Sequence, residues 1–258
     1  MPETPVPDTP VTVILLAGQR AGVVNPLAAR AGVSHKCLVP IHGKPLIAHV
    51  LDTLTALPAV EAIRISLEPE AHGEVGEIVA AYAGCGVPIE LLASAPRIVD
   101  SVLAAAGDDP GPFIVTTADN VLLTPAAVAQ VRGEMIGIDG VLAVARKESV
   151  LAAHPEGQRG FYKVRGGAYA NCNIYGLANR AALNAGAEMF RSGGQFMKHA
   201  SRAIEVFGLH NIVLLRLGYF DLAGRRGETQ GSVIPAQPSM VHMEANAALA
   251  QTAYPAPQ

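Results

Sequence analysis

The sequence predicts a three-layer α/β fold, with helices on both faces of a mostly parallel central sheet. Short apolar runs typical of buried strands alternate with segments of helical spacing between residues 11 and 145. Of the 258 residues, 50% are hydrophobic and only 16% are charged, which is enough apolar material for one large core. We therefore expect a single domain over residues 11–252, with an inserted subregion at about 146–235, a flexible leader at 1–10 and a flexible tail at 253–258.

The first expected strand, residues 11–17, is apolar and rich in β-branched side chains, as is typical of a strand buried on both faces. Further strands are expected at residues 62–67, 88–92, 113–117, 140–145, 160–164, 170–177 and 211–217. A helix is expected from Pro45, because the apolar residues that follow have helical spacing. Other helices are expected at 74–82, 98–106, 125–135, 178–190, 195–207 and 244–252, loops at 18–35 and 224–231, and a short extended piece at 36–41.

Composition and charge exclude several classes of protein. The chain has 19 Lys and Arg against 22 Asp and Glu, so it lacks the basic excess of a duplex-binding protein and no nucleic-acid partner is expected. Its three cysteines form no CxxC pair, which argues against a disulfide framework or a cysteine-rich zinc site. The apolar run near the start is far shorter than the ~20 residues of a membrane span, and the proline-rich leader is unlike a signal peptide. We expect a cytoplasmic location.

The loop after the first strand is the first candidate binding element. In open α/β sheets, ligands bind outside the carboxyl ends of the strands, which is where this loop lies. Gly18 and Gly22 allow backbone N–H groups to approach an anion, Arg20 offers a planar fork for phosphate, and Lys36 offers a point charge. An ordinary surface loop with solvated cations is the alternative.

Neither GxGxxG nor GxxxxGK[ST] occurs in this loop, which argues against a classical dinucleotide dehydrogenase and against a P-loop NTPase. His35, beside Lys36, is expected to be a solvated loop histidine.

Asp119 is the second candidate, because it follows the strand expected at 113–117. A carboxylate at that edge of the sheet suits Mg²⁺ carrying substrate phosphates, which needs only one or two protein carboxylates. The alternative is that Asp119 or Asn120 caps the turn before Pro125.

With these two motifs the chain resembles the MobA-like nucleotidyltransferases, a family with the Rossmann-like GT-A type of fold. The resemblance spans most of residues 11–249. It implies Mg²⁺-dependent transfer of the NMP group of an NTP to a phosphorylated small-molecule acceptor, with release of pyrophosphate. The residues that carry it are Ile14, Leu15, Leu16, Ala17, Gly18, Arg20, Lys36, Leu38, Gly43, Lys44, Pro45, Leu46, Thr117, Ala118 and Asp119.

The resemblance also implies roles for individual residues. Arg20, Lys36 and Asp119 would be catalytic, with Asp119 and Glu244 as metal ligands. The acceptor side would comprise about 146–235 and be contacted by Asn120, Asn173 and Lys198. Nucleotide-binding residues would be Leu16, Ala17, Gly18, Gln19, Arg20, Lys36, Ser94, Ser101 and Ala118.

Two departures from the family pattern leave alternatives open. The loop LAGQRAG is shorter than the common LAGGxGxRxG form, and His242 with Glu244 replaces an acidic turn near the end. Glu244 can still supply an oxygen ligand, whereas histidine suits Mg²⁺ poorly. A non-catalytic nucleotide-binding protein and a GT-A glycosyltransferase are the competing hypotheses. The base, the acceptor (a molybdopterin-type cofactor, a sugar or polyol phosphate, or a phospho-alcohol) and a homo-oligomeric state are left open.

Overall fold

The computed structural model describes residues 9–19, 25–136, 138–156, 160–164 and 167–191. The central sheet of this part contains β1 (Val11–Leu16), β4 (Val60–Leu67), β5 (Ile89–Ala93), β6 (Phe113–Thr117), β7 (Gly140–Arg146), β8 (Tyr162–Val164) and β9 (Gly167–Leu177). A separate hairpin pairs β2 (Pro40–Ile41) with β3 (Lys44–Pro45). The helices are α1 (Pro26–Ala31), α2 (Leu46–Thr55), α3 (His72–Ala80), α4 (Ile98–Ala106), α5 (Pro125–Glu134), α6 (Lys147–Ala153) and α7 (Arg180–Arg191), with 3-10 turns η1 (Lys36–Leu38) and η2 (Pro69–Ala71).

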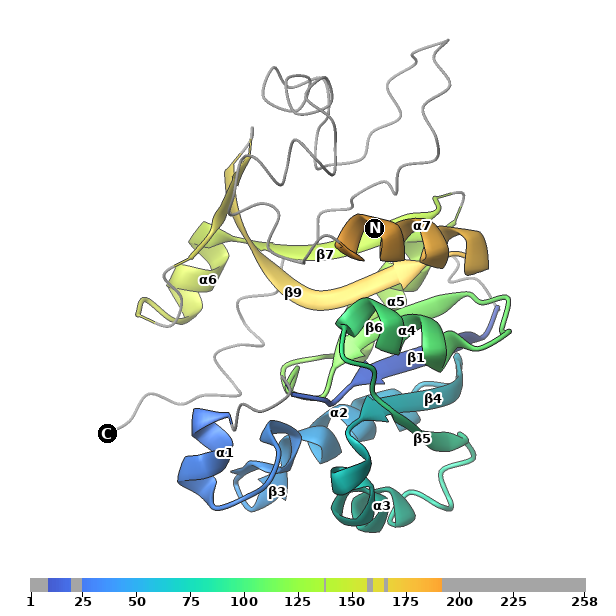
Figure 1. The fold of residues 1–258 in the computed structure, drawn as a ribbon. Helices are drawn as coiled ribbons and strands as arrows, with labels where there is room; N and C mark the ends of the chain where they lie inside the picture. Colours follow the sequence, from blue (N-terminus) through green and yellow to red (C-terminus); the bar gives the residue numbers. More distant parts are fainter. Residues whose placement is uncertain (1–8, 20–24, 137, 157–159, 165–166, 192–258) are drawn as a thin grey trace, which may run out of the picture.

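The strands run in the order β5-β4-β1-β6-β9-β7, with β8 beside β9 (Figure 1). Neighbouring strands among β5, β4, β1 and β6 are parallel, whereas β9 is antiparallel to both β6 and β7. The predicted three-layer, mostly parallel α/β fold is therefore confirmed. Because four parallel strands end at one edge, the residues that follow them lie side by side there.

Helices cover both faces of the sheet (Figure 1). On one face, residues of α2, α3 and α5 form one core cluster with alternate residues of β1, such as Val13 and Leu15, and with most of the buried side chains of β4. On the other face, Ile14 of β1 packs with residues of β6, α4 and α7. The continuous apolar run of β1 is thus explained by burial on both sides of the sheet.

Several local elements differ from the expectation. The helix α1 lies inside the stretch expected to be a loop: Asn25 accepts a hydrogen bond from the N–H of Leu27, Pro26 occupies the first turn, and Gly32 closes the helix with a φ of 69°. The segment expected to be extended at 36–41 begins with η1, and α6 was not expected. The elements expected at 195–207, 211–217, 224–231 and 244–252 lie outside the described residues.

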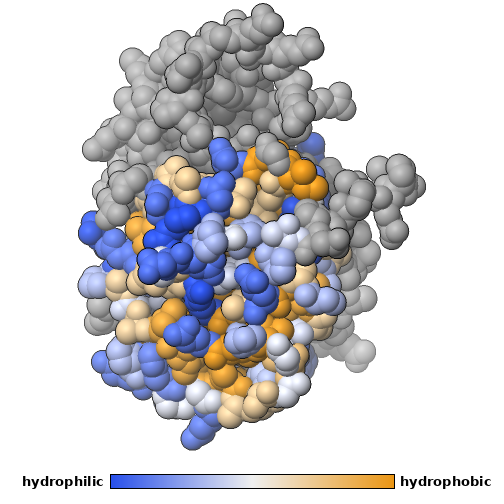
Figure 2. Space-filling model, turned by 90° about the vertical axis from the view of Figure 1, so that its right-hand side faces the viewer, coloured by the Kyte–Doolittle hydropathy of each residue, from blue (hydrophilic) through white to orange (hydrophobic). Residues whose placement is uncertain are grey.

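Figure 2 views the side that lies to the right in Figure 1, where β1 begins, and shows hydrophobic side chains gathered in its lower part. The candidate site lies at the opposite ends of the parallel strands, to the left in Figure 1. Within the described residues, none of the helices has the length and apolarity that crossing a membrane requires.

Candidate functional site at the carboxyl edge of the sheet

Polar residues form a row where the parallel strands end. Ser94 follows β5, Glu68 follows β4, Gln19 lies beyond β1, and Asp119 lies beyond β6. The antiparallel strand β9 adds Asn173 to the row, because its neighbour Ile174 pairs with the penultimate residue of β6. Segments far apart in the sequence therefore present polar groups along one edge.

Lys36 and Asp119 meet in this row as an ion pair, although 83 positions separate them in the sequence. The Lys36 ammonium comes from η1 and donates a hydrogen bond to the Asp119 carboxylate. Both side chains are about one-third exposed, so the pair is open to a ligand. Burial alone would raise the pKa of Asp119, but the hydrogen bond from Lys36 and the charge of Lys36 outweigh burial and hold that pKa below its usual value. Asp119 is therefore ionised at neutral pH.

The backbone N–H groups at the beginning of the loop after β1 donate hydrogen bonds to other groups of the protein. The N–H groups of Ala17 and Gly18 donate to the carbonyl of Ser66 at 2.9 and 3.2 Å. The N–H of Gln19 donates to the Glu68 carboxylate, with N···O distances of 3.0 and 3.3 Å to its two oxygens. These contacts tie the beginning of the predicted phosphate loop to the end of β4.

His35 is buried rather than solvated, which corrects the sequence-based expectation. Its residue exposure is 5%, and its Nε2 lies 3.3 Å from the carboxylate of Glu68. Sequence reasoning also missed Glu68 itself. The signal that singled out Asp119, an acid directly after a buried strand, applies equally to Glu68.

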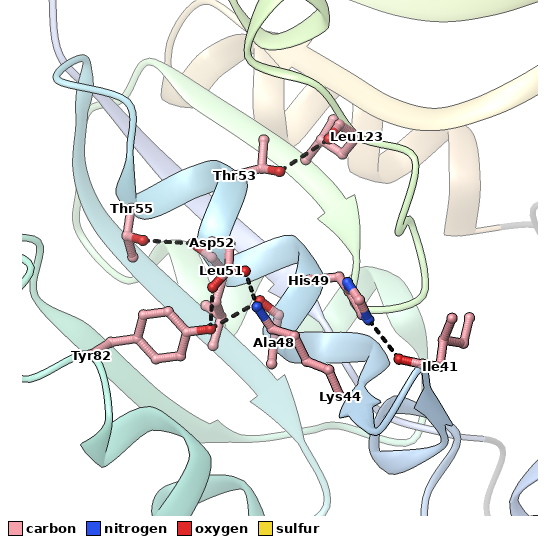
Figure 3. A network of polar contacts seen from close by, with 10 residues as sticks. All are labelled: Ile41, Lys44, Ala48, His49, Leu51, Asp52, Thr53, Thr55, Tyr82 and Leu123. Atoms are coloured by element: carbon pink, nitrogen blue, oxygen red, sulfur yellow. Dashed lines mark hydrogen bonds and ion pairs between the residues drawn. The ribbon is translucent and has the colours of Figure 1, made fainter. Parts of the chain in front are cut away.

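The GKP segment plays a different part in the structure from that of Lys36. Lys44 pairs with Asp52 of α2, and Asp52 also accepts a hydrogen bond of 2.7 Å from the hydroxyl of Tyr82 (Figure 3). His49, on the same helix, contacts the carbonyl of Ile41 at 3.2 Å. This network fastens the β2–β3 hairpin to α2, so it helps to fix the chain that follows η1.

Asn173, the predicted acceptor contact, lies at an irregularity of β9. The register between β7 and β9 shifts between Leu142 and Val144, and Asn173 has a φ of 53°. Its N–H donates to the side-chain oxygen of Asn171 at 2.9 Å, and its carbonyl accepts from the hydroxyl of Thr116 at 2.8 Å. Bulges of this kind re-aim side chains beside functional sites. The bulge leaves Asn173 exposed next to the end of β6.

The left-handed conformation of Asn173 predicts an unusual order of stability among its variants. Asn173→Ala is expected to lower the free energy of unfolding by about 1 kcal/mol, because alanine tolerates positive φ poorly. Asn173→Gly is expected to be more stable than Asn173→Ala, although glycine usually weakens a strand. Urea unfolding of the two variants measures the difference. An alanine variant as stable as the glycine variant would contradict this account.

The remaining described candidates form hydrogen bonds that join parts of the fold. The Asn120 amide group donates to the Thr116 hydroxyl and to the carbonyl of Cys172, joining the end of β6 to β9. The Ser101 hydroxyl is buried and exchanges hydrogen bonds with the backbone of Ala95, which holds the loop that contains Ser94. Leu16 and Ala118 are joined by a backbone hydrogen bond of 2.9 Å.

Five candidates, Arg20, Gly22, Lys198, His242 and Glu244, lie outside the described residues. Within the described residues no group of three or more His, Cys, Asp or Glu side chains could hold a metal ion. Mg²⁺ is typically held by one or two carboxylates together with substrate phosphates. The ionised, partly exposed Asp119 fits that requirement as a single protein ligand beside a triphosphate.

Comparisons with solved structures agree with this architecture. A hypothetical transferase from Thermus thermophilus is 21% identical with a TM-score of 0.60, over 92% of this chain and 93% of that chain. A 4-diphosphocytidyl-2C-methyl-D-erythritol synthase from Anaerococcus prevotii is 8% identical with a TM-score of 0.55, over 92% and 88%. A CMP:2-keto-3-deoxy-manno-octonic acid synthetase complexed with CTP is 16% identical with a TM-score of 0.53, over 80% and 86%. At these identities the likeness shows the fold.

The sequence comparison shows the family. No curated protein sequence matches this chain. A family model described as the MobA-like NTP transferase domain matches residues 13–206, which is most of the chain. The chain belongs to the family of MobA-like NTP transferase domains.

Proposed function

We propose that this protein transfers the NMP group of an NTP to the phosphate of a small-molecule acceptor and releases pyrophosphate, with Mg²⁺ as cofactor. The observation that carries the proposal is the Lys36–Asp119 pair at the carboxyl edge of the parallel sheet. Asp119 follows β6, which lies between β1 and β9 in the sheet, so the loop after β1 would receive the triphosphate and the β9 bulge would receive the acceptor. Membership of the family and a structural neighbour solved with CTP support an NTP as donor.

The reaction requires positioning and charge neutralisation more than proton transfer. An oxygen of the acceptor phosphate forms a bond to the α-phosphorus, and the bond between that phosphorus and the bridging oxygen to the β-phosphate breaks. The acceptor phosphate is already an anion, so no catalytic base is needed. The main barrier is bringing two polyanions together and stabilising the charge on the reacting phosphoryl group.

The candidate residues supply groups of the right kind for these tasks. The Lys36 ammonium would leave Asp119 and contact oxygens of the α-phosphate. Asp119, with Glu244 as a second predicted ligand, would hold Mg²⁺, which neutralises phosphate charge when bound. Asn173, exposed on the β9 bulge, would contact the acceptor. Arg20 would add a second cation on the triphosphate.

Pyrophosphate release tests the function directly. Each of ATP, GTP, CTP and UTP is incubated with Mg²⁺ and with a sugar phosphate, a polyol phosphate, a phosphorylated alcohol or a phosphorylated pterin. We expect one base and one acceptor class to give release that depends on both substrates. Tight NTP binding without release for any acceptor would contradict the proposal and favour the non-catalytic hypothesis.

A further inference from the structure

We propose that Glu68 is a positioning residue of the nucleotide site: it clamps the loop after β1 and, through His35, the turn that carries Lys36. This inference rests on the proposed function, because it assigns Glu68 a role in NTP binding. Glu68 directly follows β4, the neighbour of β1 in the sheet. It therefore extends from a strand buried in the core toward both functional segments.

The contacts of Glu68 are part of a ring that runs through Gln19, Ser34 and His35. The Glu68 carboxylate accepts a hydrogen bond from the backbone N–H of Gln19 and lies 3.3 Å from Nε2 of His35. The side-chain amide of Gln19 in turn donates to the carbonyl of Ser34 at 3.2 Å. The carbonyl of His35 accepts the N–H of Leu38, so the clamped histidine begins the turn that contains Lys36.

The contact between Glu68 and His35 is important because the imidazole is buried. The side chain of His35 is 7% exposed, and neither ring nitrogen has a hydrogen-bond partner of good geometry. A buried polar group without a hydrogen bond is costly, and the Glu68 carboxylate 3.3 Å from Nε2 would offset that cost. Lys36 is adjacent in the sequence and is held by Asp119. Two carboxylates that follow different strands, those of Glu68 and Asp119, thus lie against two consecutive residues, His35 and Lys36.

Close packing against Gly18 supports the same clamp. A Cβ atom added to Gly18 would lie 3.1 Å from one carboxylate oxygen of Glu68, tighter than ordinary van der Waals contact. The glycine therefore lets the Glu68 carboxylate lie directly against the loop backbone. The contact is specific in shape as well as in charge.

Glu74 is a second carboxylate near the same turn. It therefore provides a control that separates the effect of the position of Glu68 from the effect of its charge. Burial, together with the charges of Glu68, Glu74 and Asp119, raises the pKa of the Cys37 thiol to about 12. Glu74 accepts a hydrogen bond of 3.1 Å from the Ser34 hydroxyl. A purely electrostatic effect would therefore appear in Glu74→Gln as well as in Glu68→Gln.

The test measures the dissociation constants of ATP, GTP, CTP and UTP, each with Mg²⁺, by isothermal titration calorimetry. Glu68→Ala is expected to weaken the tightest-binding NTP about tenfold, which is a loss of about 1.4 kcal/mol. Glu68→Gln should stay within about threefold of wild type, since its carbonyl still accepts the Gln19 N–H. Glu68→Asp keeps the charge but shortens the arm, so it should resemble Glu68→Ala. Glu74→Gln should leave binding unchanged.

A double-mutant cycle tests whether Glu68 acts through Lys36. If it does, Lys36→Ala should weaken NTP binding at least about threefold less in the Glu68→Ala background than in the wild type. Multiplicative effects, or tighter NTP binding after loss of Glu68, would overturn the proposal. Tighter binding would instead mean that the carboxylate competes with phosphate for the Gln19 N–H.

Amide hydrogen exchange at Gln19, together with NTP binding, distinguishes failure of the positioning role of Glu68 from failure of the proposed transferase function. Protection in the wild type that is lost in Glu68→Ala, with unchanged NTP affinity, overturns the positioning role and leaves the transferase function standing. Wild-type protein that binds none of the four NTPs overturns the transferase function itself, together with the role of Glu68 in it.

Discussion

Replacing Lys36 by alanine is expected to abolish NMP transfer almost completely while leaving the fold intact. Removing one group that stabilises charge in a transition state typically lowers kcat by about 10²–10³-fold. Lys36 is the described cation that lies beside Asp119 at the candidate site. Because an ion pair open to solvent is worth only about 0–1 kcal/mol, the thermal stability of the variant should hardly change.

Lys44 provides the matched control for this experiment. It is as exposed as Lys36, with 36% of each side chain accessible, and it also pairs with a carboxylate, that of Asp52. Its network fastens the hairpin to α2 (Figure 3). Lys44→Ala is therefore expected to retain transfer activity. Pyrophosphate release by the two variants decides the matter, and wild-type rates in Lys36→Ala would refute the assignment.

Asp119→Asn is expected to remove the dependence of NTP binding on Mg²⁺. In the wild type, the ionised carboxylate supplies a hard oxygen ligand, and its lowered pKa keeps it charged throughout the neutral range. The amide preserves shape and still offers Lys36 an acceptor, so the fold should be kept. We expect the gain in NTP affinity on adding Mg²⁺ to fall by about tenfold or more in the variant.

Titration calorimetry of the best NTP, with Mg²⁺ and with EDTA, measures this change. Asp52→Asn is the control, because Asp52 is also a carboxylate paired with a lysine but belongs to the hairpin network. It should keep the full effect of Mg²⁺. If Asp119→Asn also kept it, the metal would have to be held elsewhere.

The regular elements of the fold could be predicted from the sequence because their signals are local. The strand expected at 113–117 and the helix expected at 98–106 match β6 and α4 to the residue. Both consist mainly of apolar residues with clear breaks at Gly107 and Gly111. The helix α1 was harder to find, because it is six residues long and buries only Ala28. Its signal was the sequence of Asn25, Pro26 and Gly32 at its two ends.

The candidate site could be predicted only where one residue follows one strand. Asp119 and the loop after β1, with Lys36 as a cation for phosphate, were found in this way, and the family resemblance gave Lys36 its catalytic role. The clamp of Glu68 and His35 could not be found, since it depends on β1 and β4 being neighbours in the sheet. Sequence spacing does not show this pairing. The irregular register of β9, which places Asn173, is likewise a consequence of tertiary packing.

Thermal unfolding of the wild-type protein with ATP, GTP, CTP or UTP, each with and without Mg²⁺, tests the central claim most directly. A ligand that binds only the folded state adds about 2.7 kcal/mol of stability at a concentration of 100 times its Kd. The account predicts that one of the four NTPs raises the melting temperature strongly and that this rise requires Mg²⁺. If none of the four NTPs shifts the transition, the carboxyl edge of this sheet is not a nucleotide site.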